Sequence, residues 1–310
     1  MDIKKYEVLL GALDKGCFTK ACEGLGYTQP AITGMMKSME QEIGFPLLRR
    51  SNKGIQLTTE GEEVLPLIQE IVNLNEKLTQ KYDLLRGLET GRVRIGSFPT
   101  VACAWLPAII SRFEKRYPHI QIELLEENSL TCLEKWLSSG YIDLCFISKQ
   151  PHHTFKWFAL REDPYYALLS TGHPLTAYES IPVEMLAAYP FLICKSKDGP
   201  DADISRYFAE NHLSVQLKFS SNLDYTIAFM VRENIGISML PDLLLRTLFD
   251  GGHRGLEIRP TEPPASRQLG IAVRSAKDIS PAMSRFIKCA QSVAEDSFAS
   301  VQEERLALLK

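Results

Sequence analysis

The chain has 310 residues, of which 45% are hydrophobic and 24% are charged, and its formal net charge is −3 at pH 7. These proportions are those of ordinary globular domains, and the length predicts two or three folding units rather than a small disulfide-held scaffold. The slightly acidic balance excludes a chain that coats nucleic acid or an anionic membrane along its whole length. Any contact with DNA must therefore be local.

The distribution of cysteines and apolar residues predicts a cytoplasmic protein. The seven cysteines include no Cys-x-x-Cys pair, which favours free thiols in a reducing compartment over a disulfide framework. The N-terminus carries four charges within its first seven residues and so has no signal-peptide core. The apolar runs elsewhere are shorter than a membrane-spanning helix requires, so no membrane partner is expected.

The first sixty residues predict three short helices followed by a hairpin. Apolar residues at helical spacing place one helix over residues 3–14 and a second after Thr19 that ends at Gly26. Thr28 can cap a third helix that ends at Gly44, and the single apolar stripe of this helix consists of Ile32, Met36, Met39 and Ile43. Residues 47–58 predict two short strands joined by a polar turn, which is typical of a wing.

The side of the third helix opposite its apolar stripe carries groups that suit a DNA groove. Gln29 can form two hydrogen bonds with an adenine edge, Thr33 can bond a base or a phosphate, and Lys37 can neutralise a phosphate or reach guanine. Three basic residues of the hairpin can contact the sugar-phosphate backbone without reading its sequence. They are Arg49, Arg50 and Lys53. Considered without their context, these residues also fit an ordinary solvated surface.

From residue 16 to residue 61 the sequence resembles the DNA-binding segment of the LysR-type transcription regulators. The match depends on the order and spacing of Phe18, Thr19, Ala21, Leu25, Gln29, Pro30, Ala31, Thr33, Glu40, Gly44, Leu47, Arg50, Leu57, Thr58 and Gly61. The resemblance implies a winged helix-turn-helix over residues 1–58. Its expected DNA contacts are Thr28, Gln29, Pro30, Thr33, Lys37, Arg49, Arg50 and Lys53. Gly34 and Met35 depart from the polar or basic residues common there in the family, and up to residue 60 eight basic residues barely outnumber seven acidic ones. Both observations predict modest binding by each monomer.

Residues 59–90 predict a long linker helix that dimerises. Thr59 and Glu62 can form a capping box, and Pro66 should bend the helix. Its seam alternates in steps of four and three along Val64, Ile68, Ile71, Asn75, Leu78, Tyr82 and Leu85. In LysR-type proteins this stretch pairs with its counterpart in a second subunit, so the resemblance implies a homodimer or homotetramer. Packing of the seam against its own domain is the alternative.

From Gly91 onward, strands alternate with helices, which predicts a doubly wound α/β architecture. Strands are expected at residues 91–98, 120–126 and 141–148, and a second such set follows. The resemblance continues through RVRIG, RYP, GHPL, NIGISMLP and SPAMSRFI. It implies a two-lobed effector domain of the periplasmic-binding-protein type over residues 91–310. We place lobe I at about 91–163 and 268–310 and lobe II at about 164–267, with crossings near 162–166 and 266–270.

Candidate effector-binding residues follow the strands, because open α/β sheets bind ligands beyond the carboxyl ends of their strands. In the first lobe these candidates are Ser97, Phe98, Thr100, Ser148 and Lys149. In the second lobe they are Lys195, Ser221 and Asn222. The two lysines favour an anionic effector such as a carboxylate or a phosphate. The alternatives are that the hydroxyl groups only cap a helix and that the lysines are solvated.

Four other functions find less support in the sequence. The sequence contains none of four common enzyme motifs: a GxSxG elbow, an HExxH pair, a GxxxxGK[ST] loop and a GxGxxG turn. Neither catalysis nor a cofactor is therefore expected. His152 and His153 are adjacent on a polar loop with no third ligand nearby in the sequence, so no metal site is expected. Cys194 is the one candidate for a redox-active thiol. A solute-binding protein or ligand sensor without DNA-binding activity remains the alternative, but it would carry no winged helix.

The sequence therefore predicts a sequence-specific transcription regulator controlled by a small molecule in the cleft of its C-terminal domain. Its expected partners are an inverted repeat in double-stranded promoter DNA, the effector, and further copies of the chain. RNA polymerase is a further expected partner if the regulator activates transcription.

Overall fold

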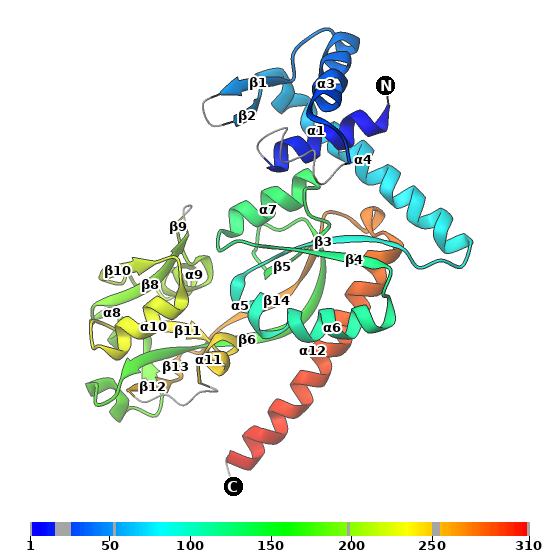
Figure 1. The fold of residues 1–310 in the computed structure, drawn as a ribbon. Helices are drawn as coiled ribbons and strands as arrows, with labels where there is room; N and C mark the ends of the chain where they lie inside the picture. The colour runs from blue at the N-terminus through cyan, green and yellow to red at the C-terminus, as the bar shows by residue number, and fades with distance from the viewer. Residues whose placement is uncertain (1, 16–25, 52–53, 197–198, 250–254, 309–310) are drawn as a thin grey trace. The chain divides into compact units, whose positions relative to one another are not determined.

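The computed structural model describes residues 2–15, 26–51, 54–196, 199–249 and 255–308. These residues fall into two compact units, of which the first comprises residues 1–88 with 138–141 and the second comprises residues 89–137 with 142–310. Figure 1 shows the chain coloured from blue at the N-terminus to red at the C-terminus. No helix in the described ranges is long and apolar enough to cross a membrane.

The N-terminal unit contains two described helices, a hairpin and a long helix (Figure 1). In chain order they are α1 (Ile3–Lys15), α3 (Gln29–Ile43), β1 (Leu48–Ser51), β2 (Gly54–Leu57) and α4 (Thr59–Leu85). Their buried side chains form one core, to which α1 contributes Leu9, α3 contributes Ile32 and α4 contributes Ile68. The predicted second helix, with Thr19, and the hairpin residue Lys53 lie outside the described residues.

Local hydrogen bonds set the ends of α3 and α4. The predicted cap of α3 is confirmed, because Thr28 Oγ1 accepts a hydrogen bond from the backbone N–H three residues later at 3.4 Å. Gly44 ends this helix at φ 86°, a conformation that glycine adopts without steric cost. The expected cap of α4 at Thr59 is wrong by one residue. Thr58 is the extended residue there, and its Oγ1 accepts from the N–H of Gly61 at 2.9 Å.

The apolar residues of α4 are divided between the core and the surface. Val64 and Ile68 from the predicted seam pack into the core of the N-terminal unit, so this part of the seam serves its own domain. Six other large apolar side chains of the helix are between 41% and 75% exposed. They form a stripe, called the α4 stripe below, that consists of Leu67, Ile71, Leu74, Leu78, Tyr82 and Leu85. Pro66 lies inside the helix without ending it.

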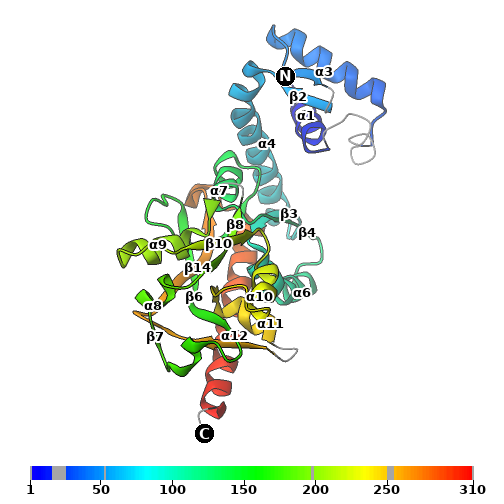
Figure 2. The same cartoon turned by 90° about the vertical axis from the view of Figure 1, so that its left-hand side faces the viewer.

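The second unit is an α/β domain made of two groups of elements, called lobe I and lobe II (Figures 1 and 2). Lobe I contains β3 (Gly91–Ser97), α5 (Pro99–Ala104), α6 (Leu106–Arg116), β4 (Ile120–Glu126), α7 (Leu130–Ser139), β5 (Leu144–Ser148), η2 (Ala276–Asp278) and α12 (Pro281–Leu308). Lobe II contains η1 (Pro174–Ala177), β7 (Ile181–Pro182), α8 (Val183–Ala187), β8 (Phe191–Ser196), β9 (Gly199–Pro200), α9 (Ala202–Glu210), β10 (Leu217–Ser221), α10 (Asp224–Arg232), β11 (Ser238–Pro241), α11 (Asp242–Phe249), β12 (Leu256–Arg259) and β13 (Thr261–Glu262).

Two long strands, β6 (Lys156–Ser170) and β14 (Ala265–Val273), belong to both lobes. They pair with each other in antiparallel register, and Arg267 lies opposite Asp163 where the chain passes between the lobes. On the lobe I side β14 also pairs with β5, and β3 lies parallel to both β4 and β5. On the lobe II side β6 pairs with β11 and β12. The crossing strands therefore form a shared sheet.

Each lobe has its own hydrophobic core. In lobe I, Ile95 of β3, Ile109 of α6 and Phe286 of α12 belong to one buried cluster. Lobe II has two clusters, one containing Phe191 of β8 and another containing Ile227 of α10. Because the cores are separate, the polar residues between them can line a cavity without interrupting either core.

Candidate functional site

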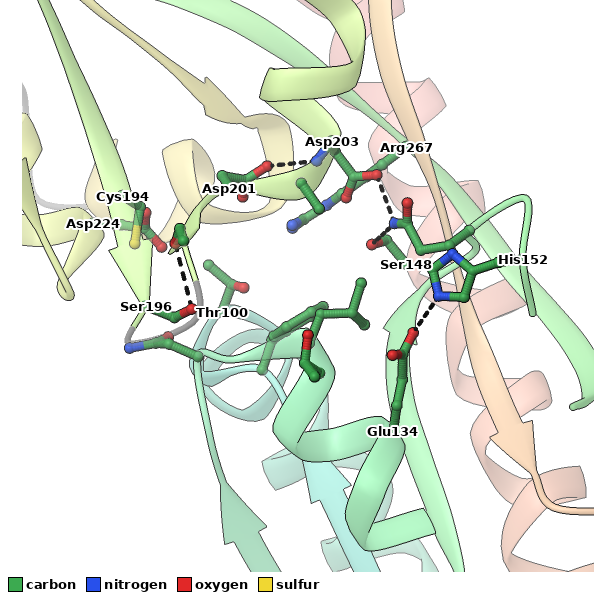
Figure 3. Close-up of a pocket in the computed structure, with 17 residues that line it drawn as sticks. Thr100, Glu134, Ser148, His152, Cys194, Ser196, Asp201, Asp203, Asp224 and Arg267 are labelled. Carbon is green, nitrogen blue, oxygen red and sulfur yellow. Dashed lines mark hydrogen bonds and ion pairs between the residues drawn. The ribbon is translucent and has the colours of Figure 1, made fainter. Parts of the chain in front are cut away.

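A cavity of about 250 Å³ lies between the lobes, close to the size of small-molecule pockets (Figure 3). Lobe I lines it with Phe98, Thr100, Asn128, Leu130, Thr131, Glu134, Ser148, Gln150 and His152. Lobe II lines it with Cys194, Ser196, Gly199, Asp201, Ala202, Asp203 and Asp224, and the crossing strand β14 adds Arg267. The cavity thus lies at the carboxyl ends of β3, β5 and β8, the place where α/β sheets bind ligands.

Arg267 is the one guanidinium group among the described residues that line the cavity. Its side chain is 5% exposed, and its Nε donates a hydrogen bond to Asp163 Oδ2 at 3.0 Å. Its Nη1 donates to the hydroxyl of Tyr165 at 3.3 Å. Its buried Nη2 lies 2.9 Å from Asp163 Oδ2, but no described residue accepts a hydrogen bond from it. A buried donor without an acceptor is costly, so this atom could bind a ligand oxygen.

Three aspartates of lobe II also line the cavity, and Figure 3 shows Asp203 beside Arg267. Asp201 caps α9, since its Oδ1 accepts from the N–H groups of Asp203 and Ile204 at 2.9 Å each. Asp203 Oδ1 accepts from Arg206 Nη2 at 2.7 Å. The carboxylate of Asp224 accepts a hydrogen bond from the thiol of Cys194.

Burial perturbs the ionisation of these groups. Burial, and then the neighbouring charge of Asp203, raise the pKa of Asp201 to about 6. Burial also raises the pKa of the Asp224 carboxyl, against the opposing effect of the hydrogen bond from Cys194. Burial raises the pKa of the Cys194 thiol far above its ordinary range. This shift disfavours the thiolate form that a redox-active cysteine needs.

Among the described residues, Arg267 and Asp203 each form a close ion pair, whereas Asp201 and Asp224 have no basic group within 4.0 Å. The charge of Arg267 is balanced by Asp163, and the charge of Asp203 is balanced by Arg206. Asp201 and Asp224 accept hydrogen bonds from backbone N–H groups and from a thiol, and the nearby charge of Arg267 lowers the pKa of both against the larger effect of burial. Burial is the main cause of the raised pKa of both groups, and neighbouring carboxylates raise that of Asp201 further.

Of the predicted effector residues, three line the cavity: Phe98, Thr100 and Ser148. Ser97 is fully buried behind them, where its Oγ donates to the carbonyl of Phe98 at 3.0 Å. Gln150 was not predicted, but its amide links the two lobes by donating to Ser148 Oγ and Asp203 Oδ1 at 3.0 Å each.

The other four predicted effector residues do not line the cavity. Lys149 and Lys195 are exposed. Side chains alternate between the two faces of a strand, and the residues on either side of each lysine face the cavity instead. Ser221 uses its Oγ to accept the N–H of Leu223 at 3.2 Å. Asn222 is exposed, but its carbonyl accepts from Asn128 Nδ2 of lobe I at 2.5 Å.

The predicted DNA-binding residues lie at two places in the N-terminal unit. Gln29, Pro30 and Lys37 are exposed on α3 and Thr33 is partly exposed, whereas Ile32, Met36 and Met39 of the same helix are buried. The hydroxyl of Thr28 is occupied by the helix cap. Arg49 is exposed on β1. Arg50 follows it with its backbone paired to Ile55, while its side chain, like all of Lys53, lies outside the described residues.

Glu40 connects these two places. Its Oε1 accepts hydrogen bonds from the backbone N–H groups of Leu47 at 2.8 Å and of Leu48 at 3.0 Å. The hairpin is therefore held to α3 by a side chain on that helix. In this arrangement the exposed polar face of α3 can enter a DNA groove, and the hairpin can contact the backbone beside it.

Together, these features define a class of protein: ligand-responsive regulators with a DNA-binding head, a long helix and a two-lobed sensor. Comparison with known families identifies the member of this class. Residues 3–62 match the bacterial regulatory helix-turn-helix protein of the lysR family, and residues 86–295 match the LysR substrate binding domain. The chain belongs to the LysR family of transcriptional regulators.

Individual relatives agree with this assignment over nearly the full length. An uncharacterized HTH-type transcriptional regulator of Bacillus subtilis, YvbU, is 27% identical over 94% of this chain and 99% of its own. The HTH-type transcriptional activator CmpR of a Synechocystis strain is 28% identical over 92% of this chain and 93% of its own. Full-length OxyR from Pseudomonas aeruginosa superimposes with a TM-score of 0.75 at 22% identity, covering 95% of this chain and 94% of that one.

The chain is therefore a DNA-binding transcriptional regulator with an effector-binding domain, and not an enzyme. The alternative of a solute-binding protein without DNA-binding activity is excluded, because the helix-turn-helix match covers the head of the chain.

Proposed function

We propose that the chain binds inverted repeats in promoter DNA as a homodimer or homotetramer and changes its activity when an effector occupies the cavity between lobes I and II. The observation that carries this proposal is the cavity itself, which both lobes and the crossing strand line. A ligand that contacts both lobes stabilises one relative arrangement of them, which is the condition for a population shift. Such a protein acts in the cytoplasm, where the promoter DNA is.

The proposed DNA contacts divide into two kinds. Gln29, Thr33 and Lys37 are spaced one turn apart on α3 and would reach base edges or phosphates in a major groove, with Pro30 beside them. The remaining residues would contact phosphates and fix the register of the head on the duplex. They are Thr28, Arg49, Arg50 and Lys53. One head provides few such contacts, so specific binding requires two heads on a two-part site.

Separate apolar surfaces support an assembly of several chains. The α4 stripe is the first of them. The second is on lobe II, where five side chains of β10 and α10 and the segment between them are between 40% and 53% exposed: Leu217, Phe219, Leu223, Tyr225 and Phe229. Contiguous apolar surfaces on soluble domains usually mark protein contacts. Two surfaces on different parts of the chain allow a dimer and also a dimer of dimers.

Lys149 and Lys195 predict an anionic effector, but both are exposed. The charged groups that line the cavity support a different and narrower class of effector. Nη2 of Arg267 needs a hydrogen-bond acceptor, whereas Asp201 and Asp224 favour a cationic or hydrogen-donating group. A small molecule with both kinds of group, such as one that carries an amine and a carboxylate, satisfies both requirements. A simple dianion would meet repulsion from the aspartates.

The effector would act by stabilising one arrangement of lobes and thereby changing the spacing of paired DNA heads. If the regulator activates transcription, RNA polymerase is its further partner at the promoter.

Binding of the purified full-length chain to fragmented genomic DNA, read by sequencing at near-physiological salt, tests the DNA part of the proposal. Enrichment of interrupted inverted repeats upstream of genes would support it, whereas uniform recovery of fragments would overturn it. For the cavity, thermal melting with a panel of amines, amino acids and dicarboxylates would be compared between the wild type and Asp224→Asn. A ligand that raises the Tm of the wild type more than that of the variant would support the proposed chemistry.

A further inference from the structure

A group of three potential metal ligands lies at the edge of the cavity and is separate from the aspartates and Arg267. Glu134 comes from α7, and His152 and His153 come from the turn after β5. Glu134 Oε1 lies 3.0 Å from His152 Nε2 and 2.5 Å from His153 Nε2. The sequence shows no third ligand next to the two histidines. The fold supplies one, Glu134, from α7, the helix that comes before β5 in the chain.

We propose that Glu134, His152 and His153 bind a divalent transition-metal ion, with Zn²⁺ as the representative case. One ligand atom from each residue lies within 4.8 Å of the other two. Two imidazole nitrogens and a carboxylate oxygen are a donor set that Zn²⁺ and its neighbours in the first transition row accept. Zinc bonds of roughly 2.0 Å in a tetrahedron place ligand atoms about 3.3 Å apart, so small side-chain movements suffice.

The surroundings hold the ligands in place without an ion. The side chain of His153 is 4% exposed and packs beside the rings of Phe155 and Trp157, with centroids at 5.5 Å and 6.4 Å. The turn is closed by a hydrogen bond from the N–H of His153 to the carbonyl of Gln150 at 3.1 Å. Fixed ligand orientation is what a metal site requires of its supporting residues.

The protons of the cluster show what the ion must displace. The Nδ1 of His153 accepts from the N–H of Gln150 at 3.2 Å, so in the neutral ring the proton is on Nε2 and points to Glu134. When the ion binds Nε2, this proton moves to Nδ1 and the bond from Gln150 is lost. Three hydrogen bonds, one from Gln150 and two to Glu134, are thus exchanged for coordination bonds at both histidines and the carboxylate.

Glu134 and His152 also line the effector cavity (Figure 3). An ion bound by three protein ligands keeps at least one position open, as in zinc sites that bind water or substrate. Here that position is at the edge of the cavity, where an oxygen of the effector could occupy it. The metal site itself does not depend on the identity of the effector.

Calorimetric titration of the full chain, purified without a histidine tag and dialysed against a chelator, tests the proposal with ZnCl₂ as the probe. We expect one ion per chain, and His152→Ala and Glu134→Gln should each lower the affinity by at least about 100-fold. His152 is 68% exposed, so its replacement leaves no cavity. His119→Ala is the matched control, because His119 is an exposed histidine elsewhere in lobe I, and it should bind as the wild type does.

Two results would overturn the proposal: no zinc binding by the wild type, or equal affinity in the wild type and the two ligand variants. The second result would assign the zinc to other groups such as the free thiols. Co²⁺ provides an independent readout, because its visible spectrum changes with the nitrogen and oxygen ligands. That spectrum should be lost in His152→Ala and kept in His119→Ala. Metal-free melting temperatures of all variants should agree, which shows that each one folds.

Discussion

Arg267 and Asp163 form a buried ion pair at the point where β14 and β6 pass between the lobes. Arg267 is 5% exposed, the side chain of Asp163 is fully buried, and Nε and Oδ2 are 3.0 Å apart. Asp163 also accepts the N–H of Leu243 at the start of α11 at 2.9 Å. The same guanidinium group lines the effector cavity, so one side chain contributes both to the crossing of the strands and to the site.

Removal of Arg267 should destabilise the effector domain strongly. Arg267→Met leaves the carboxyl of Asp163 buried without its counter-charge, and breaking a buried pair in this way costs about 3–5 kcal/mol. Replacing both residues, as Arg267→Met with Asp163→Asn, should cost less, because position 163 then carries no buried charge and the amide oxygen can still accept the N–H of Leu243. Urea unfolding followed by circular dichroism measures the difference. Equal losses in the single and the double variant would contradict this account of the crossing.

Asp201 should give the protein a pH-dependent stability with a defined sign. Burial and Asp203 raise its pKa from 3.8 to about 6, so the folded state binds this proton more tightly than the unfolded state. The stabilisation is therefore complete below about pH 4 and is lost as the pH rises through 6. Asp201→Asn keeps the helix cap but stays neutral, so at pH 7.5 it should exceed the wild type in unfolding free energy by up to about 3 kcal/mol.

The control for Asp201 is Glu210→Gln, which removes an exposed carboxylate from the same helix. Its difference from the wild type should change little between pH 4.5 and pH 7.5. The difference between Asp201→Asn and the wild type should instead shrink toward the acid end of this range. If the difference in unfolding free energy between Asp201→Asn and the wild type does not change with pH, then the Asp201 carboxyl of the wild type has the same pKa in the folded and the unfolded state.

The local features of the fold could be predicted from the sequence, whereas the chemistry of the cavity could not. Thr28 and Gly44 bound α3 as expected, because capping and the left-handed conformation depend on adjacent residues. Thr100 and Ser148 line the cavity because the ends of neighbouring strands meet there. Arg267 is far from both in sequence, and only the antiparallel pairing of β14 with β6 brings it to the site.

The exposed lysines illustrate the same limit. Lys149 and Lys195 follow or lie within strands at the correct edge, but one residue of register decides whether a side chain faces inward. Two aspartates of the cavity come from the loop before α9 and from the first turn of α10, where Asp201 and Asp224 resemble ordinary helix-starting residues in the sequence. Their burial, which raises the pKa of each, depends on packing between the two lobes and has no local signal.

On α3, Gln29→Ala should relax discrimination at one base pair by about 1–3 kcal/mol, because Gln29 is proposed to read a base edge. Arg49→Ala should instead weaken binding to all sequences alike and lower the slope of log affinity against log salt by about one. Fluorescence anisotropy with a set of single-base operator variants at several salt concentrations separates the two. An unchanged base preference in Gln29→Ala would mean that another face of α3 enters the groove.

Charge placed in the α4 stripe should weaken association of the chains. Leu78 is 48% exposed in the single chain, and Leu78→Glu would bury a carboxylate if two stripes pack together. We expect at least a tenfold rise in the dimer dissociation constant by sedimentation equilibrium, with a parallel loss of affinity for two-part DNA sites. Thr79→Glu places the same charge one residue away on another exposed side of the helix and should associate normally. If both variants associate as the wild type does, the stripe is not the dimer contact, and the apolar surface of lobe II becomes the next position to test.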